Sequence, residues 1–372
     1  MTPLNKLETF GQSVWYDNVS RHLVRSGELA ALVADGVKGV TSNPSIFEKA
    51  IGQSNQYDEE IRRAPREDDA AGVFRKLAVE DIRDACDVLR PLYDRQDGRD
   101  GFVSIEVSPY LADDTAATVE EARSLWGEIA RPNLMIKVPA TKAGVPAIRT
   151  IISEGINVNV TLLFACAMYA EVAEAYLSGL EARQRSADLS RIASVASFFV
   201  SRIDSKADAE IAEKLKAAQG QERSRLQALT GKTAIANAKL AYERYLQIYG
   251  GSARWNKLAE RGARPQRLLW ASTGTKNKSY SDVLYVEELI GPNTVNTMPP
   301  ETLAAYRDHG NPAARLQSGL VEARADLAAL EGFGISLDGI TSELLAAGVK
   351  QFKDAADTLF TAIETKRRSV AT

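Results

Sequence analysis

Short apolar segments of strand length alternate with segments of helical period along the chain, and this alternation restricts the fold more than any other feature. The strand candidates are Ser13–Asn18, Gly39–Asn43, Phe102–Ser108, Leu134–Pro139, Ile156–Leu163, Arg191–Val200, Leu268–Ser272 and Asn293–Met298. The helix candidates are Leu29–Asp35, Ala70–Leu92, Val119–Ala130, Val145–Ser153, Ala165–Leu180 and Gln221–Tyr249. Eight strands separated by helices predict an α/β protein of the closed parallel (β/α)8 type, the TIM barrel.

The chain continues well beyond the eighth predicted strand. Residues 310–372 are predicted to form a helical extension, with one helix over Gly310–Gly332 and a second over Ser336–Arg368. The second helix ends in three basic residues, which favour a helix C-terminus. We expect it to close over the barrel, with an oligomer contact as the alternative. Because α/β barrels often exceed the usual domain size, residues 1–372 are predicted to form a single domain.

Two of the predicted strands alternate in polarity. In Phe102–Ser108 the valine and isoleucine side chains fall on one face, whereas Ser104, Glu106 and Ser108 fall on the other. Residues Ile156–Leu163 alternate in the same way. An exposed antiparallel sheet would show a similar pattern, with its polar face in water. Because helices separate these strands and have to pack on their apolar faces, we expect the polar faces to point into the barrel, towards its C-terminal mouth.

A single lysine, Lys137, stands inside the apolar strand candidate Leu134–Pro139. Lysine is rarely buried without a partner, and an ammonium group in an apolar wall loses its proton more easily. That property makes Lys137 a candidate nucleophile for Schiff-base chemistry on a carbonyl compound. The alternative is a lysine at a fraying strand end that reaches the solvent.

Polar residues recur at or near the ends of the predicted strands. They are Asp17, Asn43, Glu106, Lys137, Asn159 with Thr161, Ser197 and Ser272. Each has a structural alternative: Asp17 can cap a turn, and Asn43 can begin a helix. Glu106 can simply form an ion pair with Lys137. Since these residues recur at successive strand ends, we expect a shared site in which a lysine and two carboxylates carry out carbonyl chemistry.

Histidine and cysteine are scarce, with two of each. The histidines stand alone and the cysteines lie far apart, so no histidine relay, metal site or disulfide framework is predicted. The formal charge of −3 does not indicate nucleic acid or an anionic membrane as a partner. The first residues have no apolar core of signal-peptide type, and no apolar run is long enough to span a bilayer. We therefore expect a cytoplasmic protein.

Five segments resemble transaldolases of the longer bacterial type, in the order in which that family carries them. They are Gly39-Val40-Thr41-Ser42-Asn43-Pro44-Ser45-Ile46-Phe47, Val103-Ser104-Ile105-Glu106-Val107-Ser108, Leu134-Met135-Ile136-Lys137-Val138-Pro139-Ala140-Thr141, Asn157-Val158-Asn159-Val160-Thr161-Leu162-Leu163-Phe164 and Ser197-Phe198-Phe199-Val200-Ser201-Arg202-Ile203-Asp204. The resemblance covers nearly the whole chain, and the first and third segments are the most specific. Many members carry Leu-Ala after the lysine where this chain has Val138-Pro139, a mark of a subfamily.

The resemblance implies a catalytic set. Lys137 would form the Schiff base with a ketose phosphate, and Asp17 would move the proton of the C4 hydroxyl during carbon–carbon cleavage. Glu106, with Thr161, would hold the water that shuttles protons during imine formation and hydrolysis. The substrate-binding and phosphate-binding residues implied in the same way are Asn43, Asn159, Ser197, Phe199, Arg202, Ser272 and Lys276. Lys276 stands where shorter members place a second phosphate-binding arginine, and it would act as a point charge rather than a fork.

The activity implied is the transfer of a dihydroxyacetone unit in the non-oxidative pentose phosphate pathway. The donor would be sedoheptulose 7-phosphate or fructose 6-phosphate, and the acceptor glyceraldehyde 3-phosphate or erythrose 4-phosphate. No cofactor or metal is implied, and a monomer or homodimer is expected. The nearest alternative is a fructose 6-phosphate aldolase of the same fold. A non-catalytic sugar-phosphate binder is another. A nucleotide-binding protein is a third, because Gly231-Lys232-Thr233 resembles the end of a P-loop, although Leu226 stands where that motif needs glycine.

Overall fold

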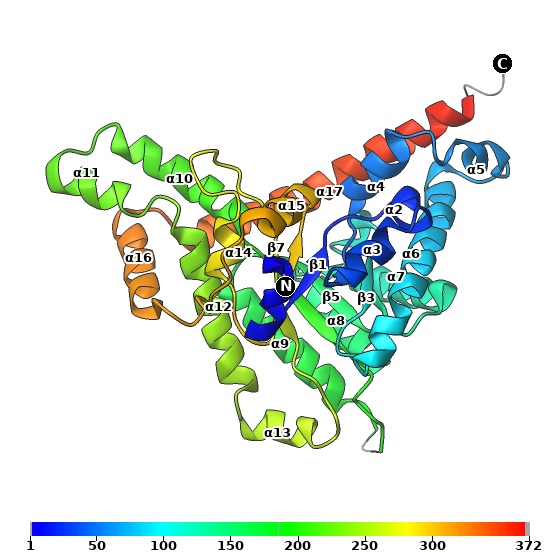
Figure 1. Ribbon diagram of the computed structural model, residues 1–372, viewed down its shortest axis with the longest axis horizontal. Helices are drawn as coiled ribbons and strands as arrows, with labels where there is room; N and C mark the ends of the chain where they lie inside the picture. The colour runs from blue at the N-terminus through cyan, green and yellow to red at the C-terminus, as the bar shows by residue number, and fades with distance from the viewer. Residues whose placement is uncertain (1, 185, 369–372) are drawn as a thin grey trace.

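The computed structural model describes residues 2–184 and 186–368. Eight parallel strands close into a barrel in the order β1 to β8, with β8 pairing back to β1 (Figure 1). They are β1 (Gln12–Tyr16), β2 (Val37–Val40), β3 (Phe102–Glu106), β4 (Leu134–Pro139), β5 (Val158–Leu163), β6 (Ser194–Phe199), β7 (Arg267–Ala271) and β8 (Thr294–Met298). Each predicted strand overlaps one of these, so the predicted (β/α)8 barrel is confirmed.

Helices surround the barrel and extend one side of it. They are α1 (Pro3–Lys6), α2 (Arg21–Arg25), α3 (Glu28–Ala34), α4 (Pro44–Phe47), α5 (Asp58–Arg63), α6 (Ala70–Arg95), α7 (Thr115–Ile129), α8 (Gly144–Ser153), α9 (Cys166–Glu181), α10 (Ser201–Leu215), α11 (Gly220–Gln227), α12 (Thr233–Tyr249), α13 (Ala253–Ala259), α14 (Leu284–Glu288), α15 (Pro300–His309), α16 (Leu320–Gly332) and α17 (Leu337–Arg368). Short 3-10 turns η1 (Leu7–Phe10) and η3 (Pro109–Leu111) and the π-helical turn η2 (Glu48–Gly52) complete the elements.

Two helix predictions were wrong in their extent. The helix predicted over Gln221–Tyr249 is two helices, α11 and α12, because Gly231 between them adopts a left-handed φ of 73°. Gly231-Lys232-Thr233 therefore follows a helix rather than a strand, and lacks the strand–loop–helix context of a P-loop. The predicted helical extension starts late, since residues 310–319 are not helical and α16 begins only after Gly319, which has a φ of 69°. Its last residues, 369–372, lie outside the described part of the chain.

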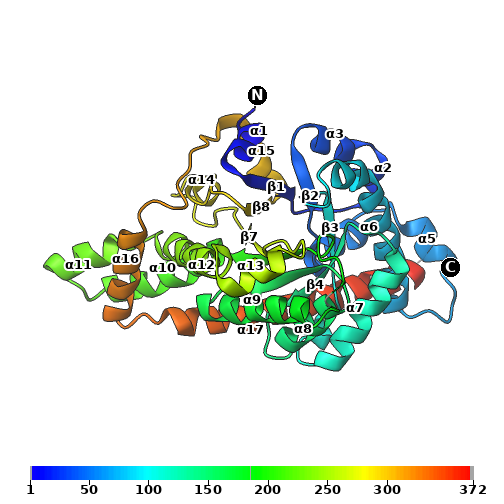
Figure 2. The same cartoon turned by 90° about the horizontal axis from the view of Figure 1, so that it is seen from below.

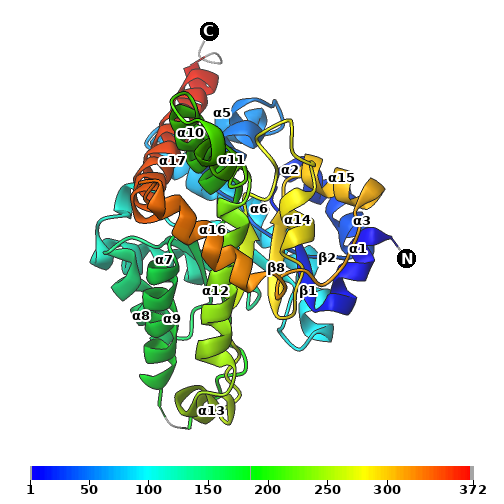
Figure 3. The same cartoon turned by 90° about the vertical axis from the view of Figure 1, so that its left-hand side faces the viewer.

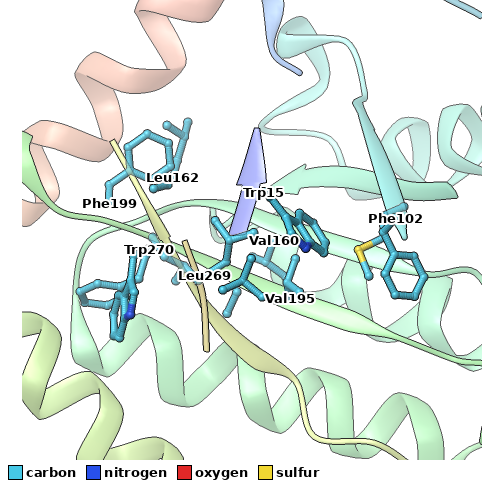
Figure 4. Close-up of a cluster of buried hydrophobic side chains, with 14 of the residues drawn as sticks. Trp15, Phe102, Val160, Leu162, Val195, Phe199, Leu269 and Trp270 are labelled. Carbon is cyan, nitrogen blue, oxygen red and sulfur yellow. The ribbon is translucent and has the colours of Figure 1, made fainter. Parts of the chain in front are cut away.

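Buried apolar side chains fill the space between the strands and the surrounding helices. Figure 4 shows part of this core, including Trp15 and Phe102, whose ring centroids lie 6.2 Å apart. Trp15 donates from Nε1 to Asp100, and its ring lies so close to Gly39 that a Cβ there would come within 2.5 Å of it. Glycine is thus required at position 39 within β2, because a larger residue would collide with the Trp15 ring of β1.

The long helix α17 crosses the molecule and contacts α4, α6, α10 and η2 (Figures 1 and 2). Figure 3 shows α10, α11, α16 and α17 gathered on one side. Gly348 of α17 faces Leu162 of β5, whose backbone has a left-handed φ of 57°. Near its end, Lys366 pairs with Asp58 at 2.6 Å, which ties α17 to α5. Among the helices that the structure describes, none combines the length and apolar character needed to cross a membrane.

Candidate active site

Three predicted site residues lie side by side on neighbouring strands. Glu106 of β3 is in register with Lys137 of β4, which is in register with Asn159 of β5. Lys137 is only 4% exposed; its Nζ donates to the Ser42 carbonyl oxygen at 3.0 Å and lies 3.6 Å from Glu106 Oε2. The alternative of a lysine that reaches the solvent from a strand end is therefore wrong. A buried amine beside a carboxyl group is the arrangement that Schiff-base chemistry needs.

A hydrogen-bonded row of side chains runs across the barrel beside the lysine. Ser197 Oγ donates to Asn159 Oδ1 at 2.6 Å, and Asn159 Nδ2 donates to Ser104 Oγ at 3.0 Å. These three side chains come from β6, β5 and β3, and all are buried. The polar faces of the strands therefore point into the barrel, as predicted, and the row fixes the orientation of the Asn159 amide.

Asp17 follows β1 and is held by Thr41, which follows β2 and is itself in contact with Thr297 of β8. Thr41 Oγ1 donates to Asp17 Oδ1 at 2.6 Å and lies 2.6 Å from Thr297 Oγ1. Burial raises the pKa of Asp17, and the positive charge of Lys137 opposes this rise most strongly. Thr41 and Thr297 were not predicted as parts of the site, although Thr41 stands in the transaldolase-like segment that begins with Gly39.

Glu106 carries an unusual carboxyl group. Burial raises its pKa to about 7, although Lys137 acts in the opposite direction, and Asp17 adds to the rise. Its Oε2 has no hydrogen-bond partner among the described residues, and neither does the buried hydroxyl of Thr161 on β5. Buried polar atoms normally have partners. These two atoms belong to β3 and β5, the strands on either side of the strand of Lys137.

A pocket of about 490 Å³ opens above Lys137 at the C-terminal ends of the strands. The predicted residues that line it are Asp17, Asn43, Lys137, Ser197, Phe199, Arg202, Ser272 and Lys276. Three predicted residues do not line it: Asn159 lies behind Ser197, and Glu106 and Thr161 lie outside its wall. Lys49 from η2 and Gln351 and Phe352 from α17 also line the pocket. These three residues were not predicted from the sequence, because none of them lies near a strand end.

Three basic side chains besides Lys137, those of Lys49, Arg202 and Lys276, line the pocket together with the acidic Asp17 and Glu301. Arg202 stands in the first turn of α10, with its guanidinium 5.4 Å from the centre of the Phe199 ring. Burial lowers the pKa of Arg202, and Asp17 opposes this shift. Ser272 follows β7 with a left-handed φ of 56°, an uncommon backbone for a residue other than glycine, and its Oγ lies 3.0 Å from Ser201 Oγ. Together with Lys276, these groups can bind an anion such as a phosphate.

The donor set does not point to a metal. Across residues 2–184 and 186–368, no group of three or more histidine, cysteine, aspartate or glutamate side chains is placed to hold a metal ion. The arrangement instead offers an amine, two carboxyl groups of raised pKa and three further basic side chains.

Comparison with known proteins agrees with this geometry. Residues 14–363 match the family described as "Transaldolase/Fructose-6-phosphate aldolase". The chain is 51% identical over 356 residues to a protein named "Transaldolase" from Thiobacillus denitrificans, covering 95% of this chain and 97% of that one. It is 46% identical to "Transaldolase" from Trichodesmium erythraeum, over 98% of this chain and 97% of that one. A "Transaldolase" from Parafrankia sp. is 48% identical, over 99% of both. The chain belongs to the transaldolase/fructose-6-phosphate aldolase family.

Proposed function

We propose that this protein is a transaldolase, a transferase that moves a dihydroxyacetone unit between sugar phosphates through a Schiff base on Lys137. The observation that carries the proposal is the buried Lys137 amine 3.6 Å from Glu106, beneath a pocket lined by three further basic side chains. The relatives named "Transaldolase" match this chain over nearly its full length and support transfer as the activity. The donor would be fructose 6-phosphate or sedoheptulose 7-phosphate, and the acceptor glyceraldehyde 3-phosphate or erythrose 4-phosphate.

In the proposed reaction the Lys137 amine attacks the C2 carbonyl of the ketose. A nitrogen–carbon bond forms, and the carbonyl oxygen leaves as water. Since the pKa of Glu106 is raised to about 7, its carboxyl group can both give and take a proton near neutral pH. The unpaired Thr161 hydroxyl and Glu106 Oε2 would hold the water that carries these protons. The protonated imine then accepts the electron pair of the broken carbon–carbon bond.

Asp17 would take the C4 hydroxyl proton as the bond between C3 and C4 breaks. The hydrogen bond from Thr41 holds one of its oxygens at 2.6 Å and leaves the other for the substrate. The released aldehyde leaves, and the three-carbon unit stays on Lys137 until an acceptor aldehyde arrives. Returning the proton from Asp17 to the new hydroxyl completes the transfer.

The remaining pocket residues would orient the substrate. Asn43 Oδ1 accepts from the backbone N–H of Ile46 at 3.0 Å, so its amide NH2 group is left to bind a substrate hydroxyl. Ser197, whose hydroxyl is oriented by its hydrogen bond to Asn159 at 2.6 Å, would hold a hydroxyl of the dihydroxyacetone unit, with Phe199 as the apolar wall. The phosphate would bind Arg202, Ser272 and Lys276. We further expect a cytoplasmic enzyme of the non-oxidative pentose phosphate pathway, active as a monomer or homodimer.

Borohydride trapping tests the proposal. Fructose 6-phosphate and borohydride should modify the wild-type protein at the peptide that contains Lys137, as mass spectrometry will show. Lys137→Ala should fold, lose the trapped adduct and lose transfer to erythrose 4-phosphate. Lys142→Ala, which removes an exposed lysine five positions along the chain, is the matched control and should behave as wild type. Near-normal transfer by Lys137→Ala would place the nucleophile elsewhere, and release of free dihydroxyacetone without transfer would identify an aldolase.

A further inference from the structure

A second cavity lies beside the active-site pocket, beneath α17 and against α6 and α7. Its volume is about 280 Å³. Glu106 lines this cavity and not the pocket, whereas Lys137 lines the pocket and not the cavity. Asn43 lines both. Glu106 therefore borders the second cavity, and Lys137, 3.6 Å from its carboxyl group, borders the pocket.

The inner end of this cavity is polar. Glu106 has a side chain that is only 4% exposed, and its Oε2 has no hydrogen-bond partner among the described residues. The nearest cation, Lys137 Nζ, is 3.6 Å away. A buried oxygen without a donor is costly in free energy, so a donor on the cavity side would stabilise this carboxyl group.

The outer end of the cavity is also polar. Arg75 and Glu121 line it with side chains that are 31% and 19% exposed, and Arg75 Nη1 lies 3.5 Å from Glu121 Oε1. The other oxygen of Glu121 accepts from the backbone N–H of Ser108 at 2.8 Å. Between the two ends the walls are mainly apolar, with Phe47, Phe74, Leu125, Leu359 and Phe360 among them. Since a water molecule occupies roughly 30 Å³ in the liquid, the cavity has room for several water molecules.

We propose that this cavity is a water and proton route to Glu106, separate from the mouth through which the substrate enters. The inference rests on the proposed Schiff-base function. Imine formation joins Lys137 nitrogen to C2 and releases one water, and hydrolysis consumes one water and restores the carbonyl. During both steps a sugar phosphate occupies the pocket above Lys137. Glu106 can exchange protons and water with the second cavity rather than with the pocket. The mouth of the pocket can therefore stay closed around the substrate.

Filling the cavity tests the route without touching the catalytic residues. Ala356 of α17 lines the cavity and is 4% exposed, so Ala356→Leu narrows it with a residue that favours helix. The matched control is Ala355→Leu, the neighbouring alanine, which lines neither space. The readout is the exchange of the C2 oxygen of fructose 6-phosphate with isotopically labelled water, together with kcat and KM for transfer. Because positioned proton transfer contributes ~10²–10⁴ in rate, we expect exchange and kcat to fall about tenfold in Ala356→Leu, with KM changed less than about twofold.

A second variant keeps the test decisive if Ala356→Leu does not fold. Ala71→Leu fills the same cavity from α6, at an exposed position that tolerates a larger side chain. Exchange at the Ala355→Leu rate in the folded filled variants would overturn the route while leaving the transfer activity intact. Absence of trapping and transfer in the wild type would instead overturn the proposed function.

Discussion

At the scale of single residues, Glu106 should make the stability of the protein depend on pH. Its pKa is about 7 in the folded protein, against an ordinary value of 4.5, because it is buried. Between these two values the native state keeps a proton that the unfolded state has lost, so the free energy of unfolding falls as pH rises through this window. It then levels off above pH 7. A shift of this size corresponds to up to about 3 kcal/mol.

Glu106→Gln removes this titration while keeping the shape of the side chain. Relative to wild type, the variant should gain up to about 3 kcal/mol in free energy of unfolding between pH 5 and pH 8. Urea unfolding of both proteins at the two pH values measures it. Lys137 and Asp17, the charged groups that face Glu106, are present in both proteins and so cancel to first order. A constant difference between the two proteins at both pH values would contradict the raised pKa.

Asp17 and Glu106 are expected to act at different steps, so their alanine variants should fail at different points of the reaction. Asp17→Ala should still form the imine with fructose 6-phosphate but stall before cleavage, so that borohydride traps a six-carbon adduct. Glu106→Ala should form the imine slowly, with a delayed first step in single-turnover traces and little accumulation. Each loss should lie in the range of ~10²–10⁴ that general acid–base catalysis contributes. Mass spectrometry of the reduced proteins measures the adducts. A mainly three-carbon adduct on Asp17→Ala would show that cleavage proceeds without this carboxyl group.

The sequence pattern reveals some site residues and not others, depending on whether their position within a strand is unusual. Lys137 is conspicuous because a charged residue interrupts an apolar strand, and Glu106 because it stands on the polar face of an alternating strand. Thr41 and Thr297 are not, because threonine is an ordinary strand residue and their contact exists only once the barrel closes. Lys49 is one basic residue among many until η2 brings it to the pocket.

At the scale of elements, the packing of β1 against β2 depends on a missing side chain. The Trp15 ring is fixed by its bond to Asp100, and a Cβ on Gly39 would come within 2.5 Å of it. Gly39→Ala should therefore destabilise the protein by about 1–3 kcal/mol, the cost typical of overpacking. The matched control is Gly127→Ala in α7, where a Cβ meets nothing within 4 Å. It should stabilise by about 0.5–1 kcal/mol, because alanine favours helix. Thermal unfolding measures both, and an unchanged Gly39→Ala would mean that the ring can move.

The strands were predicted more accurately than the helices for a physical reason. Apolar strands such as Leu134–Pro139 are bounded by turn residues, and β4 has those same limits. Helical period, in contrast, continued across Gln221–Tyr249, where a left-handed Gly231 separates α11 from α12. A Cβ atom added at Gly231 would lie 2.8 Å from the Tyr280 ring. The end of α11 before Gly231 is therefore tied to a residue that is distant in sequence.

At the scale of the whole molecule, the C-terminal helix α17 forms part of the wall of both the pocket and the second cavity. Gln351 and Phe352 line the pocket above Lys137, and Ala356 and Leu359 line the second cavity. The pairing of Lys366 with Asp58 anchors the far end of the helix. The sequence indicated a closing helix from its length and its basic end. It could not indicate which turn meets the pocket, because that depends on how the helix docks over β5.

Replacing Phe352 tests whether α17, by closing one side of the pocket, keeps the three-carbon unit on Lys137 until an acceptor arrives. While the unit waits on Lys137, solvent that enters through the mouth can protonate it and lead to free dihydroxyacetone. Phe352→Ala opens the wall, so the ratio of dihydroxyacetone release to transfer should rise by ~10-fold, and KM for the acceptor should rise as well. Leu345→Ala is the matched control, since it removes a partly buried leucine from the same helix away from both cavities. Product analysis with fructose 6-phosphate and erythrose 4-phosphate gives the ratio for both variants. An equal ratio in both would show that closure of the mouth by Phe352 does not decide between transfer and release.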